Sequence, residues 1–284
     1  MLSNLKDVLK KAQAGGYAVP AFDCVEDLMV RTILETCESL RAPAILMGLI
    51  GPDLEGRGWN YVSGLVRAVA AGHDIPVVLH LDHAQKLEDI QRAVDLGFTS
   101  VMIDGSSLPF AENVRLTRAA VDIAARQGVS VEAELGHVGG LDLESTTHAE
   151  SVLTDPEEVR RFVAETGVSA LAVSIGTSHG IYRSQPTLNQ QRLSEIRAAS
   201  DVPLVLHGGS GTPDDQIQES VRRGVTKLNI YADNRIAMCR GLREAAAAQT
   251  RPDPLPRDLF GPVRQRLSEV VSAKIQLLFA AQRV

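Results

Sequence analysis

Three histidines beside carboxylates are the residues of this sequence best suited to chemistry. His83 ends the run VVLHLDH, His179 follows SIGTS, and His207 ends PLVLH. Imidazoles that converge from separate segments suit a zinc ion that keeps one coordination position open and acts as a Lewis acid. A lone histidine is more often a hydrogen-bonded structural residue, but three in the same context favour a metal site.

The segments that must position these histidines are short apolar runs separated by amphipathic stretches. Alternating β and α units predict parallel strands joined by crossover helices, and eight units predict a single (β/α)8 TIM barrel over residues 1–284. An open doubly wound sheet would carry a GxGxxG turn after its first strand, and AFDCVED contains none. The eight runs begin at Tyr17, Pro43, Pro76, Thr99, Val129, Ser169, Pro203 and Thr226.

Two further helices and one long loop are expected around the barrel. MLSNLKDVLKKAQAGG is typical of an amphipathic helix that ends at glycines. Residues 249–259 are rich in proline and predict a surface connection to an additional C-terminal helix, GPVRQRLSEVVSAKIQLLF. Residues 136–151 are irregular and follow the fifth run, where a barrel carries its active-site loops.

Composition narrows the class of protein. The chain has 284 residues, 44% of them hydrophobic, and a formal net charge of -6, with its cations scattered among acids. This balance argues against a nucleic-acid partner. No apolar stretch is long enough to span a bilayer, so no membrane partner is expected. Three cysteines without CxxC spacing predict neither a disulfide framework nor a thiolate metal site, so we expect a cytoplasmic protein.

Reactive side chains should gather at the carboxyl ends of the strands, where barrels build their sites. His80 shares the strand face of Asp82 one layer deeper, so a supporting role is expected for it. His73, His137 and His148 fall in helix-end or loop contexts and are placed outside the site. The strand-end candidates are His80, Asp82, His83, Asp104, Ser106, Glu132, Glu134, His179, His207, Asn229 and Asp233.

The stretch HGGSG after the seventh run could bind a phosphate. Gly208, Gly209 and Ser210 offer backbone N–H groups just before a helix that begins TPDDQIQES. Glycines after a strand are more often simple turn formers, but the loops after strands seven and eight are the usual phosphate site of a barrel.

Together these segments resemble the class II aldolases, specifically the fructose- and tagatose-bisphosphate aldolases, over almost the whole chain. The matching segments are AVPAF, LHLDH, SVMIDGS, VEAELG, LTDPEE, TGVSALAVSIGTSHGIY and PLVLHGGSG. The resemblance implies that His83, His179 and His207 hold a catalytic Zn²⁺, with Glu134 and Asp104 as carboxylates beside it.

The resemblance also implies roles for the remaining site residues. Asp82 would exchange a proton with the C4 hydroxyl, and Asp142, which aligns with a family Glu, would serve the enolisable carbon. The implied substrate-binding residues are Gly180, Arg183, Gly208, Gly209, Ser210 and Asn229. A monovalent cation near the phosphate and a homodimer or homotetramer are further implications.

The implied reaction is cleavage or formation of the C3–C4 bond of a ketose phosphate or bisphosphate, with dihydroxyacetone phosphate as donor. Cleavage leaves a carbanion, which a metal ion can stabilise. Asp23, Tyr231 and Ala232 depart from the family pattern and bear on the substrate. They leave open a modified or unphosphorylated sugar, or a non-catalytic sugar-phosphate-binding barrel.

A Schiff-base aldolase is the enzymatic rival. Lys227 shares strand parity with Asn229 and is expected to face the barrel interior. The competing interpretation of Lys227 is a buried structural cation paired with a carboxylate of the barrel.

Overall fold

Eight parallel strands close into a barrel in the order β1 to β8, with β1 also paired to β8. The computed structural model describes residues 2–24, 26–51, 53–139, 151–178 and 185–284. The strands are β1 (Val19–Asp23), β2 (Ala44–Leu49), β3 (Val77–Ala84), β4 (Ser100–Ile103), β5 (Ser130–Leu135), β6 (Ala170–Val173), β7 (Leu204–Leu206) and β8 (Val225–Ile230). Each overlaps one predicted run, so the predicted (β/α)8 barrel is confirmed.

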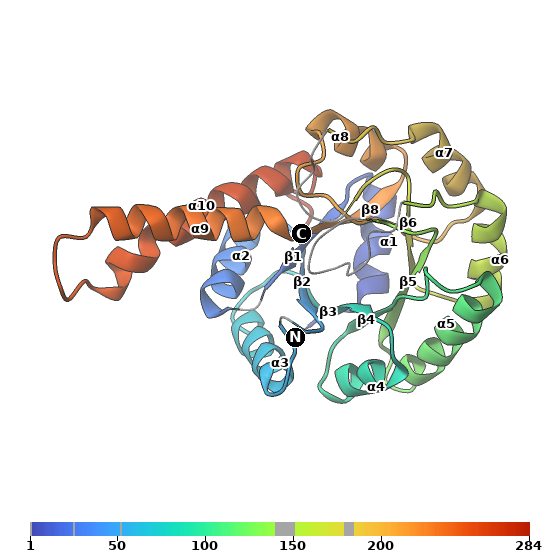
Figure 1. Ribbon diagram of the computed structural model, residues 1–284, viewed down its shortest axis with the longest axis horizontal. Coiled ribbons are helices and arrows are strands. Elements are labelled where there is room, and N and C mark those ends of the chain that lie inside the picture. The colour runs from blue at the N-terminus through green and yellow to red at the C-terminus, as the bar shows by residue number, and fades with distance from the viewer. Residues whose placement is uncertain (1, 25, 52, 140–150, 179–184) are drawn as a thin grey trace.

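Helices surround the barrel and cover the outer face of its strands (Figure 1). Almost every strand residue is buried as a result, which explains why the strands are nearly continuous apolar runs. The helices are α1 (Leu5–Gly15), α2 (Asp27–Ser39), α3 (Gly58–Ala70), α4 (Leu87–Asp95), α5 (Phe110–Ala125), α6 (Pro156–Thr166), α7 (Gln190–Ala199), α8 (Asp214–Arg222), α9 (Ala232–Ala248) and α10 (Pro256–Leu277). Among the described residues, none of these helices combines the length and apolar character needed to cross a bilayer.

Helix α1 lies over the amino-terminal end of the barrel. The side chain of Asn4 caps the helix by accepting from the Lys6 N–H at 3.0 Å, and the same N–H lies 3.0 Å from the Ser130 hydroxyl at the start of β5. Gly16 ends the helix with φ of 64°, a left-handed conformation that glycine adopts without strain. The opposite, carboxyl end of the barrel carries the reactive side chains.

Helices α9 and α10 pair into an arm that projects away from the barrel (Figure 1). The predicted C-terminal helix is confirmed, but it begins at Pro256, inside the segment predicted as a connection. Proline suits the first turn of a helix because its missing N–H would have no partner there. The surface connection is therefore shorter than the sequence suggests.

We expect Gly241→Ala to loosen the arm. A Cβ at Gly241 would lie 2.7 Å from the Val263 nitrogen and closer still to Val263 Cα, so the two helices would have to separate. Overpacking of this kind costs ~1–3 kcal/mol and should lower the midpoint of thermal or urea unfolding. Gly261→Ala is the matched control on α10, because its Cβ meets no atom within 4 Å and alanine favours the helix. Equal stability of the two variants would contradict the close approach.

Candidate active site

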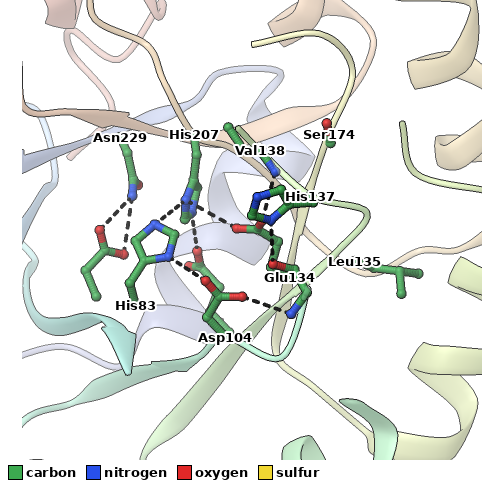
Figure 2. A network of polar contacts seen from close by, with 12 residues as sticks. His83, Asp104, Glu134, Leu135, His137, Val138, Ser174, His207 and Asn229 are labelled. Atoms are coloured by element: carbon green, nitrogen blue, oxygen red, sulfur yellow. Dashed lines mark hydrogen bonds and ion pairs between the residues drawn. The ribbon is translucent and has the colours of Figure 1, made fainter. Parts of the chain in front are cut away.

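Side chains from four strands converge at the carboxyl end of the barrel. His83 on β3 and His207 after β7 lie with Nε2 and Nδ1 2.9 Å apart, and their rings meet edge to face. Figure 2 shows the His83 ring joined to both His207 and Asp104. The sequence-predicted residues His83, Asp104, Glu134 and His207 therefore lie together.

A β-bulge in β3 directs His83 into this cluster. Regular alternation places His80 and Asp82 on the inward face of β3 and would point His83 outward. The pairing of β3 with β4 shifts register between Leu81 and Ala84, and His83 has φ of 48°. Bulges redirect a side chain and recur beside active sites. This one places two consecutive residues at the same site.

His83 and Asp104 form an ion pair. His83 Nδ1 lies 3.0 Å from Asp104 Oδ2, and Asp104 Oδ1 accepts from the Ser106 N–H at 3.0 Å. Burial alone would lower the pKa of His83, but the carboxylates of Asp82 and Asp104 outweigh it and hold this pKa well above its usual range. Burial likewise opposes the charge of Asp104, but His83 keeps the pKa of Asp104 below its usual range.

The surroundings of Glu134 test whether a metal ion fits this site. One of its oxygens accepts from the Val138 N–H at 3.2 Å, whereas Oε2 is buried without a hydrogen-bond partner in the described part of the chain. This oxygen lies 3.7 Å from His207 Nδ1. Burial and the nearby Asp104 carboxylate raise the pKa of Glu134 to about 8. A cation among these groups would satisfy the unpaired oxygen and favour the ionised carboxylate.

The donor atoms fit a divalent metal. Ligand atoms of Asp82, His83 and His207 lie within 4.8 Å of one another, and so do those of His83, Asp104 and Glu134. Nitrogen and oxygen donors in a buried cluster suit Zn²⁺, although this set alone does not distinguish Zn²⁺ from other transition metals.

Asp82 is held as an ionised carboxylate beside the histidines. Asn229 Nδ2 lies 3.1 and 3.3 Å from its two oxygens, and His80 Nε2 lies 3.4 Å from Oδ1. Burial alone would raise the pKa of Asp82, but His83 and His80 lower it well below its usual range. His80 is fully buried and anchored to Ser100 Oγ at 2.7 Å, which fits the supporting position expected from the sequence.

The HGGSG segment packs tightly against its neighbours. Gly208 has φ of 69°, and a Cβ there would overlap the backbone of Ser178. The Gly209 N–H donates to the Asn229 carbonyl at 3.1 Å, and the Ser210 hydroxyl lies 3.2 Å from two backbone N–H groups at the start of α9. The structure thus places these residues at the barrel mouth, while their phosphate role stays a prediction.

Several predicted site residues lie outside the described residues. These are Asp142, His179, Gly180 and Arg183, as is His148. Their roles stay predictions that rest on the resemblance.

Three further residues contact the site: His137, which the sequence placed outside it, the strand-end candidate Glu132, and Lys227. The Ser106 hydroxyl lies 3.2 Å from His137 Nδ1, and Glu132 Oε1 lies 3.0 Å from His207 Nε2. Lys227 Nζ is fully buried and lies 2.9 Å from Glu132 Oε2, which matches the interpretation as a paired structural cation. Strand parity was the available signal for Glu132, which shares the inward face of β5 with Glu134.

A family model and several solved structures match this chain, and they agree with one another. The family model described as fructose-bisphosphate aldolase class-II matches residues 3–283. The YdjI aldolase from Escherichia coli K12 is 31% identical, with a TM-score of 0.88 over 100% of this chain and 99% of that chain. A candidate fructose-1,6-biphosphate aldolase from Coccidioides immitis is 31% identical, with a TM-score of 0.85 over 99% and 97% of the two chains. The fructose-bisphosphate aldolase of Campylobacter jejuni, at 23% identity, has the same fold, with a TM-score of 0.81 over 99% and 95%.

We expect Zn²⁺ to bind more weakly as the pH falls. The raised pKa of His83 keeps a proton on the imidazole that a metal ion must displace. Below that pKa, the proton on His83 competes with the ion, so the apparent Kd should rise at least about tenfold per pH unit. Zn²⁺ titrations between about pH 6 and pH 8 measure this dependence.

The control for this titration is His73→Gln. His73 lies 3.0 Å from Glu38, away from the barrel mouth, and its loss should leave the pH dependence unchanged. A Kd that stays constant over this range would contradict His83 as a ligand.

Proposed function

The chain belongs to the class II fructose-bisphosphate aldolase family, a family of lyases, and from that premise we propose that it is a zinc-dependent aldolase. It would cleave or form the C3–C4 bond of a ketose phosphate, with dihydroxyacetone phosphate as donor. The observation that carries this proposal is the contact of His83 with His207 at 2.9 Å beside the ionised Asp82.

The metal would be held by His83 and His207, joined by His179 as the resemblance implies. Glu134 and Asp104 offer carboxylate oxygens on the same side of the cluster. When bound, the ion supplies Lewis-acid polarisation of the ketose carbonyl.

Asp82 would act as the base for the C4 hydroxyl. Its low pKa keeps it ionised, and Asn229 orients its carboxylate, with His80 Nε2 3.4 Å away. Removing the hydroxyl proton allows the aldehyde half to leave, and returning it completes the reverse reaction. Asp142 would serve as the second base, at the enolisable carbon.

The phosphate of the donor half would bind near the HGGSG segment. Gly208, Gly209 and Ser210 lie at the barrel mouth beside Asn229, and Gly180 and Arg183 are assigned to the same phosphate by resemblance. A monovalent cation beside the phosphate is part of the proposal.

The second candidate is an aldolase whose aldehyde half carries no phosphate. Asp23 ends β1 at the barrel mouth, is 2% exposed, and lies near the side chain of Asp53. Burial raises the pKa of Asp53 to about 6. A phosphate dianion beside this pair would meet carboxylate charge that Arg235 offsets only in part, and this favours a neutral, hydroxylated aldehyde half.

A homodimer or homotetramer in the cytoplasm completes the proposal. The arm exposes Ile236, Leu242 and Phe260, and a second copy of this chain would cover them. The three cysteines carry free thiols, which suits a reducing compartment.

Chelator treatment should abolish aldol cleavage, and Zn²⁺ should restore it. The assay should compare ketose bisphosphates, ketose monophosphates and unphosphorylated ketoses, with monophosphates cleaved best if Asp23 and Asp53 exclude a second phosphate. Chelator-resistant cleavage that borohydride traps on a lysine would overturn the zinc mechanism.

Asp82→Asn should separate the two half-reactions. Loss of a general base lowers the rate of C3–C4 cleavage by about 10²–10⁴-fold. Exchange of the enolisable proton of dihydroxyacetone phosphate, followed by NMR, should persist because it uses a different base. Asp214→Asn removes an exposed acid of α8 and is the control. Equal loss of both reactions would contradict the role of Asp82.

A further inference from the structure

A buried ion pair lies directly beneath the histidine cluster. Lys227 Nζ on β8 lies 3.0 Å from Glu132 Oε1 and 2.9 Å from Glu132 Oε2 on β5. Both residues are fully buried, and removing either one would leave an uncompensated charge in the barrel. The proposed chemistry assigns no role to this pair.

Glu132 connects the pair to His207. Its Oε1 lies 3.0 Å from His207 Nε2. A carboxylate that contacts an ammonium through both oxygens can accept hydrogen bonds but not donate them, so the proton between Glu132 and His207 belongs to Nε2. In the neutral imidazole, the lone pair then lies on Nδ1.

The Nδ1 atom faces the cluster of possible metal ligands. It lies 2.9 Å from His83 Nε2 and 3.7 Å from Glu134 Oε2. The opposite tautomer of His207 would put a hydrogen on this nitrogen and block coordination. The hydrogen bond made by one ring nitrogen therefore decides whether the other can bind a metal.

We propose that Lys227 and Glu132 are positioning residues that fix His207 in the Nε2–H tautomer and present its Nδ1 lone pair to a divalent metal. This inference requires the metal ion of the proposed function. It does not depend on the identity of the sugar. Lys227 acts through Glu132: its ammonium, 3.0 and 2.9 Å from the two carboxylate oxygens, keeps the carboxylate ionised. Lys227 is thus assigned a role other than that of a Schiff-base nucleophile.

The test is Zn²⁺ binding by Lys227→Met, Glu132→Gln and the double variant, measured by competition with a chromogenic chelator. Partners that orient a ligand change metal affinity by about 10–100-fold, so each single variant should weaken binding by at least about tenfold. The double variant should bind no more weakly than Glu132→Gln, because Lys227 acts through Glu132. Zn²⁺ affinity is measured without any substrate, so a lack of aldolase activity would not affect this result.

Thr226→Val is the matched control on the same strand. It removes a buried hydrogen bond of 2.9 Å to the Leu204 carbonyl without touching His207, and should lower the unfolding temperature while leaving the Zn²⁺ Kd unchanged. A folded Lys227→Met with the Kd of the unaltered protein would overturn the proposal, as would additive effects in the double variant.

A second measurement begins with the unaltered protein. Nitrogen-15 NMR of the histidine side chains in the metal-free, full-length protein distinguishes the two tautomers. We expect His207 to carry its proton on Nε2 and to lose this preference in Glu132→Gln. A proton on Nδ1 alone would overturn the inference even if the Lys227 variant failed to fold.

Discussion

Closure of the barrel is the constraint on which the site depends. His83 and His207 are 124 residues apart in the chain, and their contact at 2.9 Å exists only because β3 and β7 belong to one closed sheet. The loop-closure entropy of so distant a contact is offset by the burial of apolar side chains on both faces of every strand. The scaffold that supplies stability thus also sets the distances between the reactive groups.

The interior near the carboxyl end is polar in spite of that apolar scaffold. Lys227, Glu132, His80 and Asp82 are buried in one connected cluster, where replacement by apolar side chains would often be neutral or stabilising. The cluster is therefore explained by its effect on the side chains of the active site and not by a gain in stability. Burial opposes the charges of Glu132 and Asp82, but Lys227 lowers the pKa of Glu132 and His83 lowers the pKa of Asp82. Among the described residues no group pairs with Glu134 Oε2, and a cation there would satisfy it.

The sequence predicted the architecture better than the orientation of individual side chains. The eight apolar runs coincide with the eight strands because burial on both faces leaves a local signal. The inward direction of His83 could not be derived from alternation, since Asp82 precedes it and already faces inward. The bulge that reconciles them depends on the pairing of β3 with β4, and the start of α10 at Pro256 likewise depends on packing against α9.

The left-handed backbone at His83 limits how this position can evolve. With φ of 48°, the residue occupies a region that histidine, asparagine, aspartate and glycine tolerate better than other residues, and that β-branched side chains avoid. Genetic drift at position 83 is therefore restricted by backbone energy as well as by the chemistry of the site. Position 207 carries no such backbone restriction, so it can accept a wider range of side chains than position 83 if the chemistry of the site is lost.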